Sequence, residues 1–350
     1  MDPEEGTAAT RPGARVGWLM AVGAGIGLGL AVWLIASNDV GAVASAFARV
    51  GWAGLVTVVL IRALILALCG LGWARLLDGL SPVPTAVVLR LRWVRESINV
   101  LLPVASVGGD VLGARLLTFW GVAGALAAAS VLADMMLQVG TLALFAGLGA
   151  GLLTRVEGAA AADLAWWTLR ALGVAGCLLA AFFALQRTGI VRVLEARVAA
   201  LGRRFVREAE PRPDPEPRIQ GALDAVWGPG RRGHLAQSFA LHALAWLMGA
   251  AEIAVVLACI GVEGIGLSEV LVIEALGQAI KAVAFLIPSG LGVQEGGLVL
   301  VCGLFGIDAG TALALSLAKR VPDVVLGLPA LVAWQNLEAR RAGMQPAVRP

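Results

Sequence analysis

The chain has 350 residues, of which 59% are hydrophobic and only 15% are charged, and its formal net charge at pH 7 is +3. Apolar runs of about 20 residues, the length that spans a bilayer, recur along it. These runs do not alternate as barrel strands do, so the composition predicts an all-α integral membrane protein. The basic residues fall mainly in loops beside the apolar runs, where they set topology, and they give no sign of a nucleic-acid partner.

The sequence contains no metal or cofactor motif. The four cysteines lie singly in apolar segments, and the two histidines, His234 and His242, have no acidic or cysteine partner at ligand spacing. Because a structural metal site gathers about four such ligands, we expect neither a metal nor a cofactor.

The first membrane half covers residues 15–186 and follows a tail, residues 1–14, whose composition predicts disorder. An external stretch is expected at 38–51, between the first and second spans. The apolar runs of this half predict four full spans, at 16–36, 52–77, 122–153 and 166–186.

Residues 187–235 form the main soluble segment, in which ten arginines lie against six acids. An excess of arginine marks a cytoplasmic loop, and an amphipathic stripe in its first part predicts a helix on the anionic inner leaflet. A proline-broken linker at 208–217 separates the two halves. The second membrane half, 236–337, precedes a basic cytoplasmic tail, 338–350, and its apolar runs predict two full spans, at 237–260 and 309–334.

Two stretches, residues 95–110 and 281–295, resemble one another closely. In each, a charged residue lies seven positions before a proline, and a carboxylate lies seven positions after it. Proline and clustered glycine interrupt helices, so we predict two helix–break–helix hairpins, at 85–120 and 267–305. The residues expected to form the breaks are Pro103, Gly108, Gly109, Pro288, Gly290 and Gly292.

Paired breaks at membrane depth are typical of a binding site, because irregular backbone there must be satisfied by protein or by water in a cavity. With the N-terminus in the cytoplasm, counting the spans makes the hairpins enter from opposite faces and returns the C-terminus to the cytoplasm. The prediction is an inverted-topology repeat of about eight hydrophobic segments, six full spans and two re-entrant hairpins. Each hairpin can also be read as two tilted spans, and a bundle of merely kinked helices is the alternative to a binding site.

Seven basic and seven acidic residues lie at membrane depth. An unpaired charge there costs about 2.5–3.5 kcal/mol, so the equal numbers predict internal ion pairs. A network that fixes helix register is one reading, and helix capping is another for Asp110 and Glu295. We favour a polar cavity lined by these charges and three amide side chains: Arg62, Arg92, Arg95, Glu96, Asn99, Asp110, Arg115, Asp134, Glu252, Glu274, Gln278, Lys281, Gln294, Glu295, Lys319, Arg320 and Asp323.

The helix N-termini that follow Pro103 and Pro288 leave backbone N–H groups unpaired. Such groups suit a phosphate, a carboxylate or a hydroxyl-rich headgroup, and the arginines nearby favour an anionic one.

Residues 95–110, with Gly113 to Leu117 after them, resemble the first signature of the membrane proteins associated with hopanoid biosynthesis, the HpnL family. That family belongs to the wider lysylphosphatidylglycerol synthase transmembrane-region, or flippase-like, superfamily. Residues 274–278, 290–297 and 315–320 resemble its second and third signatures, and the likeness covers roughly residues 15 to 337. Two positions depart from the family pattern, Asp110 where many relatives have Glu and Pro322 within the last span.

The resemblance implies lipid handling in the bacterial inner membrane, with membrane lipids and hopanoid-biosynthesis proteins as the partner classes. Superfamily members are flippases or lipid-translocating modules attached to an aminoacyl-transferase domain. The chain ends at Pro350 without such a domain, so we do not expect it to make aminoacylated lipids. The oligomeric state is left open.

A lipid translocator is therefore the leading prediction, with a hopanoid polyol or a phospholipid as cargo and the charged interior favouring the phospholipid. Its headgroup contacts are expected from Arg92, Arg95, Lys281 and Arg320, with Glu96, Glu274 and Glu295 balancing their charge. One alternative is an intramembrane enzyme with Glu96, Asp110 or Glu295 as its base, although no nucleophile motif accompanies them. The other alternative is a scaffold that holds hopanoid enzymes through the arginine-rich segment.

Overall fold

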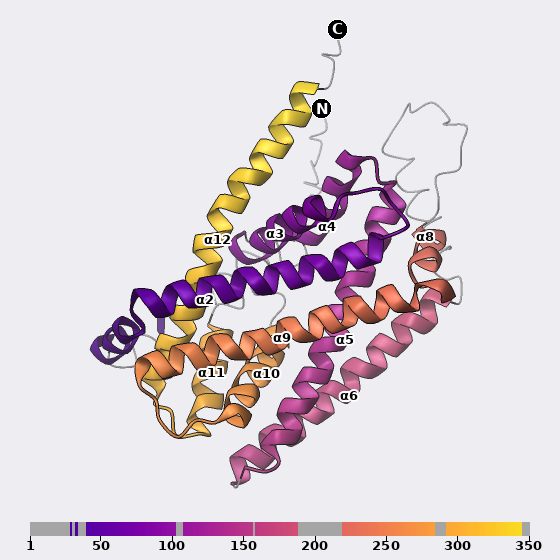
Figure 1. Cartoon of the computed structure of the whole chain (residues 1–350). Coiled ribbons are helices and arrows are strands. Elements are labelled where there is room, and N and C mark those ends of the chain that lie inside the picture. The colour runs from indigo at the N-terminus through magenta and orange to yellow at the C-terminus, as the bar shows by residue number, and fades with distance from the viewer. Residues whose placement is uncertain are drawn as a thin grey trace, which may run out of the picture.

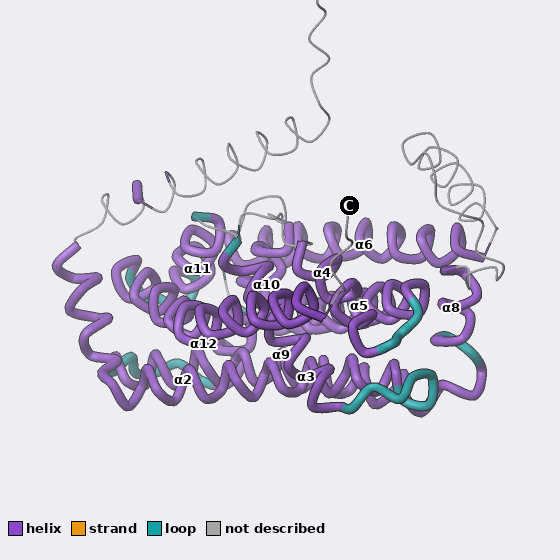
Figure 2. The backbone as a smooth tube through the Cα atoms, turned by 90° about the horizontal axis from the view of Figure 1, so that it is seen from above, coloured by secondary structure: helices purple, strands orange, loops and turns teal. Residues whose placement is uncertain are grey.

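The computed structural model describes residues 29, 32, 33, 40–102, 108–156, 158–187, 219–283 and 292–344. Within these ranges every regular element is a helix (Figures 1 and 2). The predicted tail 1–14, most of the first span and the stretch 188–218 lie outside the described residues, as do Pro103, Pro288 and Gly290.

The helices of the first half follow the apolar runs of the sequence. They are α2 (Val40–Leu77), α3 (Thr85–Leu101), α4 (Gly108–Leu117), α5 (Gly124–Leu153) and α6 (Ala159–Arg187). A short 3-10 helix, Thr118–Trp120, follows α4. The helices of the second half are α8 (Ile219–Val226), α9 (Arg232–Ile260), α10 (Leu267–Val283), α11 (Val293–Gly303) and α12 (Ala309–Met344), with a 3-10 turn at Pro229–Arg231.

Three of the described helical segments are long and apolar enough to cross a membrane. They are α2, α5 and the segment from Pro229 to Ile260 that contains α9. α12 is also long, but charged residues interrupt its apolar run near the middle, at Lys319, Arg320 and Asp323.

Helix ends differ from the expected boundaries at three places. The stretch 38–51, expected outside the membrane, is helical from Val40, and α2 bends at Gly51, whose φ of 62° and ψ of 173° are accessible to glycine. α9 begins at Arg232 rather than at residue 237, and α12 continues through the boundary expected at residue 337.

The two predicted breaks coincide with helix ends. α3 ends at Leu101 and α4 begins at Gly108, while α10 ends at Val283 and α11 begins at Val293. Gly292, directly before α11, has a φ of 75°, a left-handed conformation that favours glycine.

The packing of the helices exchanges partners between the halves. α2 runs alongside α9, and α5 runs alongside α6 (Figure 1). α4 packs against α3 and α5, and α11 packs against α10 and α12. α3 contacts α12 and α10 contacts α5, so the first helix of each broken pair packs on a long helix of the other half.

Two apolar clusters form most of the core. One gathers α9, α10, α11 and the start of α12, and the other gathers the end of α2 with α3, α4 and the start of α5. Along α2, Val58 belongs to the first cluster and Trp73 to the second, and Arg62 lies between them in sequence. On α2, Arg62 therefore lies between two segments that pack into different apolar cores.

Candidate functional site

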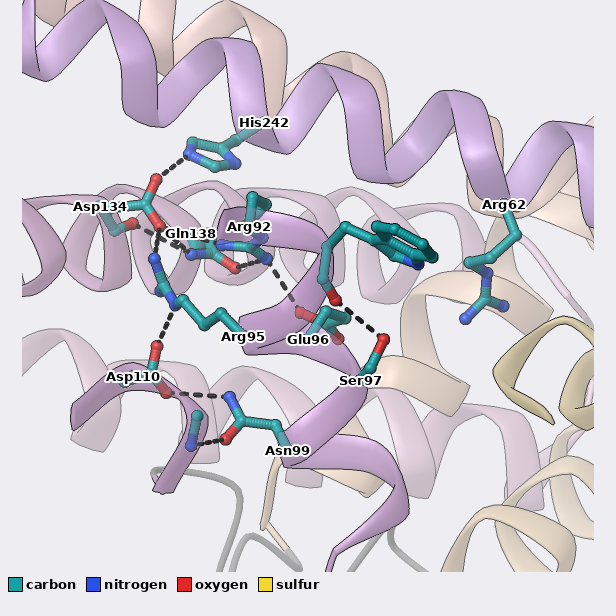
Figure 3. Close-up of polar contacts among 12 residues, drawn as sticks. Arg62, Arg92, Arg95, Glu96, Ser97, Asn99, Asp110, Asp134, Gln138 and His242 are labelled. Atoms are coloured by element: carbon teal, nitrogen blue, oxygen red, sulfur yellow. Dashed lines mark hydrogen bonds and ion pairs between the residues drawn. The ribbon is translucent and has the colours of Figure 1, made fainter. Parts of the chain in front are cut away.

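Asp134 of α5 is the centre of a buried charge cluster. Its Oδ2 accepts hydrogen bonds from Arg92 Nη1 at 2.9 Å and Arg95 Nη1 at 2.7 Å, and its Oδ1 lies 2.9 Å from His242 Nε2 (Figure 3). Both arginines project from α3 and the histidine from α9, so this carboxylate joins three helices. All four side chains are buried, where the attraction between opposite charges is stronger than in water.

The same cluster holds α4 against α3. Arg95 Nε donates to Asp110 Oδ1, and Asn99 Nδ2 donates to Asp110 Oδ2 at 3.0 Å. The backbone N–H of Gly109 donates to Asn99 Oδ1 at 2.7 Å. Asp110 lies in the first turn of α4, so its charge also complements the helix dipole.

Arg92 has two further partners. Its Nη2 donates to Glu96 Oε2 at 3.1 Å and to Gln138 Oε1 at 2.9 Å, while Gln138 Nε2 donates to Asp134 Oδ2 at 2.8 Å. The guanidinium of Arg95 also lies 5.2 Å from the centre of the Trp73 ring, within range of a cation–π contact.

A second cluster gathers charges from α2, α9, α10 and α12. Arg62 of α2 binds Glu252 of α9 through two parallel hydrogen bonds of 2.7 and 2.6 Å, the strongest geometry for this kind of pair. Its Nη1 also lies 3.3 Å from Asp323 Oδ1. Lys319 Nζ lies 2.6 Å from Glu274 Oε2 and 3.3 Å from Glu252 Oε2.

Glu295 combines an ion pair with a helix cap at the start of α11. Its Oε1 accepts a hydrogen bond from Arg320 Nε at 2.7 Å, and its Oε2 accepts one from the backbone N–H of Gly292 at 2.7 Å. The carboxylate therefore fastens the N-terminus of α11 to α12. Ser316 Oγ adds a longer contact of 3.4 Å to Oε1.

Three adjoining hollows lie between the clusters. Their volumes are about 140, 20 and 280 Å³. Gln278 and Lys281 of α10 line all three of them, and Gln294 lines the smallest. Trp246 lines the two larger ones and donates a hydrogen bond to Thr141 Oγ1 at 3.1 Å. Because they share Gln278 and Lys281, we describe the three hollows together as the polar cavity, in which charged and amide side chains lie among apolar ones.

Lys281 differs from the other cations of the cavity. Its side chain is half-buried, and within the described part of the chain it makes no hydrogen bond or ion pair. Gln278, one turn earlier on α10, donates to Glu274 Oε1 at 2.8 Å.

Arg115 does not join the predicted site. It is exposed, pairs with Glu338 at 2.6 and 2.9 Å, and lies 5.5 Å from the centre of the Phe119 ring. It follows Asp110 by five residues, which turns its side chain by about 140° around α4 and away from α3.

His242 and Gln138 belong to the charge cluster around Asp134, although the predicted site does not include them. The partner of His242, Asp134, is 108 residues away in sequence, so no spacing rule could pair them. A histidine inside an apolar span was the available signal, because an ionisable group at that depth is costly without a partner. Among the described residues, no group of three or more His, Cys, Asp or Glu side chains is placed to hold a metal ion.

Comparison with known protein families identifies a relationship over most of the chain. The model of the family described as Lysylphosphatidylglycerol synthase TM region matches residues 20–330, which include both charge clusters and the cavity between them. No curated protein matches the chain.

Proposed function

The chain belongs to the lysylphosphatidylglycerol synthase TM-region family, and from this premise we propose that it moves a lipid with a polar headgroup between the leaflets of the bacterial inner membrane. The family includes flippase-like membrane proteins. The cargo is a hopanoid or a phospholipid. The polar cavity is the observation that supports transport most directly. Charged side chains from both halves line it, and α2, α5 and α9, which contribute to its walls, are long and apolar enough to cross a membrane.

The cavity supplies what a headgroup needs inside a bilayer. Moving a polar group into hydrocarbon without hydrogen bonds costs several kcal/mol, and this cost is the barrier to spontaneous exchange. Carboxylate, amide and ammonium groups around the cavity replace the water that the headgroup leaves behind. The acyl tails stay in the surrounding lipid, so only the headgroup needs a path through the protein.

The second part of the proposal is that the two broken helix pairs form an inverted-topology repeat. The exchange of partners between the halves supports it, because α3 packs on α12 as α10 packs on α5. In such repeats a site near the midplane is opened to one side and then the other by movement of one repeat against its counterpart. We propose that the two pairs enter as re-entrant hairpins from opposite faces, and that both termini are cytoplasmic.

Leaflet exchange of a fluorescent lipid in proteoliposomes tests the proposal. The purified protein should raise the rate above that of empty vesicles, and Arg95→Ala should lower it at least tenfold by leaving Asp110 and Asp134 without their shared cation. The matched control is Arg115→Ala, which removes an arginine from an exposed pair outside the cavity and should keep the rate.

Two results would count against transport. One is an exchange rate equal to that of empty vesicles, and the other is an equal loss of rate in the Arg95 and Arg115 variants. Mass analysis of the lipid recovered from the assay completes the test, because transport without chemistry leaves the lipid unmodified.

A further inference from the structure

The arginines of the cavity are already neutralised by the protein. Each of them lies within hydrogen-bond distance of at least one carboxylate, as do Lys319 and Arg320, which lies outside the lining: Arg62 with Glu252, Arg92 with Asp134, Arg95 with Asp110, Lys319 with Glu274 and Arg320 with Glu295. An anionic headgroup would have to displace a buried carboxylate to reach any of these cations, and breaking a buried pair is costly. The expectation that Arg92, Arg95 and Arg320 bind the headgroup is therefore replaced by a narrower one.

Lys281 is the cation that remains available in the described part of the cavity. It lines all three hollows, and no described side chain or backbone oxygen pairs with it. An ammonium inside a membrane protein is costly without a partner, so we expect Lys281 to be neutralised by an anionic group of the ligand. Three N–H donors on a flexible stem make lysine a point-charge ligand for a phosphate oxygen.

Glu96 of α3 offers a charge complementary to that of Lys281 on α10. Its Oε2 binds Arg92, but its Oε1 has no hydrogen-bond partner among the described residues, and 39% of the side chain is exposed. Glu96 and Lys281 line both of the larger hollows together. Among the described residues, a ligand in the cavity therefore meets one ammonium without a hydrogen-bond partner and one carboxylate with a single oxygen unbonded.

The lining as a whole has no large excess of either charge. Five basic residues, Arg62, Arg92, Arg95, Lys281 and Lys319, face five carboxylates, Glu96, Asp110, Glu252, Glu274 and Asp323. His242 also lines one of the hollows, and its Nε2 lies 2.9 Å from Asp134 Oδ1. A lining with no large excess of either sign gives no advantage to a ligand with a net charge, which loses its hydration without a compensating field.

We propose that the cavity selects a zwitterionic lipid headgroup, whose phosphodiester oxygens bind Lys281 and whose ammonium group donates to Glu96. This inference rests on the proposed function and narrows its cargo. It sets the substrate apart from a neutral polyol, which has no anion for Lys281, and from phosphatidylglycerol, an anionic phospholipid that has no N–H cation for Glu96. Gln278 is placed to accept or donate a hydrogen bond beside the phosphate, since it lines the same three hollows as Lys281.

Lipid binding to the full-length protein in detergent, followed by native mass spectrometry, tests the selectivity without any variant. Phosphatidylethanolamine should bind at least tenfold more tightly than phosphatidylglycerol, and more tightly than a diacylglycerol glucoside. The affinity for phosphatidylcholine, whose quaternary ammonium has no N–H, should lie between those for phosphatidylethanolamine and phosphatidylglycerol. Water-soluble glycerophosphoethanolamine should fail to compete at concentrations where the lipid binds, and competition at equal concentration would overturn the assignment to a lipid.

Two substitutions then separate the two contacts. Lys281→Gln should weaken phosphatidylethanolamine and phosphatidylglycerol alike, about tenfold, because both lose the anion contact. Glu96→Gln should weaken phosphatidylethanolamine only, and Arg92 keeps Asp134 and Gln138 as partners in that variant. Arg115→Gln, outside the cavity, is the control and should change neither affinity.

Equal affinity of the wild-type protein for phosphatidylethanolamine, phosphatidylglycerol and the glucoside would overturn the inference. An equal loss of affinity for phosphatidylethanolamine and phosphatidylglycerol in Glu96→Gln would also overturn it. Failure here and failure of transport can be told apart. Selective binding with no leaflet exchange rejects the translocator and keeps the headgroup assignment, whereas exchange with no selectivity rejects the assignment alone.

Discussion

Asp134 and Lys319 are charge hubs of opposite sign at matching positions in the chain. Asp134 follows Asp110 by 24 residues, and Lys319 follows Glu295 by the same 24. Asp134 binds two arginines of α3, and Lys319 binds one glutamate from α9 and one from α10. In each half, the long helix that follows the broken pair therefore organises the charges around it, and the sign of the hub is reversed between the halves.

The hub position makes Asp134 the side chain whose loss should cost most. Asp134→Asn leaves Arg92 and Arg95 buried with one carboxylate fewer, so we expect the free energy of unfolding to fall by about 3–5 kcal/mol. Thermal or denaturant unfolding in detergent measures it. Glu338→Gln removes an acid from the exposed pair with Arg115 and should cost less than about 1 kcal/mol. Equal losses in the two variants would contradict the burial argument.

The close approach of α3 and α4 depends on Gly109. A Cβ at this position would press on the backbone oxygen of Arg95 and lie 2.7 Å from Asn99 Oδ1, and backbone cannot swing aside as a side chain can. Gly109→Ala should therefore destabilise the protein by about 3 kcal/mol. Gly140 of α5 has open space around the same substitution, so Gly140→Ala should be neutral or stabilising by up to about 1 kcal/mol. Circular dichroism melts of the two variants provide the comparison.

Arg231 ties the second half to the C-terminal end of α2. Its guanidinium donates to the backbone oxygens of Arg75 at 3.1 Å, Leu76 at 2.9 Å and Asp78, where a helix leaves carbonyls unpaired. We expect Arg231→Ala to cost about 1–3 kcal/mol in unfolding free energy. Its neighbour Arg232 is exposed and makes no hydrogen bond within the described residues, so Arg232→Ala should cost little. A larger loss for Arg232→Ala would reject the capping role.

The N-terminus of α12 has an acid cap that should respond to pH. Asp308 accepts hydrogen bonds from the Thr311 hydroxyl at 2.7 Å and the Thr311 backbone N–H at 2.9 Å, and these hold the pKa of the carboxyl below its ordinary value. A lowered pKa gives stability that is present above the unfolded-state pKa of about 3.9 and is lost as the pH falls through the folded-state value.

Asp308→Ala should therefore cost about 1 kcal/mol at pH 7 and less at pH 3. The measurement is the difference in unfolding free energy between the wild type and the variant at the two pH values. A difference that stays constant, or grows, toward pH 3 would show that the ionised carboxylate is not the cap.

Local sequence features predict most of the helices, because spans and breaks are written in short windows. The apolar runs match α2, α5 and α9, and proline with clustered glycine places the ends of α3 and α10 within a few residues. Gly51 shows the limit of this approach. An external stretch was expected at 38–51, and the sequence did not reveal that a short helix from Val40 precedes the bend at Gly51.

The site was harder to predict than the fold, because its geometry depends on contacts between distant segments. Polar stripes identified the side chains that face inward, and most of them meet around the cavity. The stripes could not say which charges neutralise which. Arg92 and Arg95 both pair with Asp134, whereas Lys281 makes no ion pair within the described residues, which is why we propose Lys281 as the ligand contact. Arg115 was placed in the cavity because it was counted among the charges at membrane depth, and depth does not say which way a side chain points.

The pairing of Arg62 has a consequence for biosynthesis. Its partners, Glu252 and Asp323, are 190 and 261 residues further along the chain. When α2 leaves the ribosome and enters the bilayer, its arginine has no counter-ion from this pair until α9 has been translated. Until then the unpaired arginine adds about 2.5–3.5 kcal/mol to the free energy of placing α2 in the bilayer, and the ion pair that offsets this cost can form only after the second half has arrived.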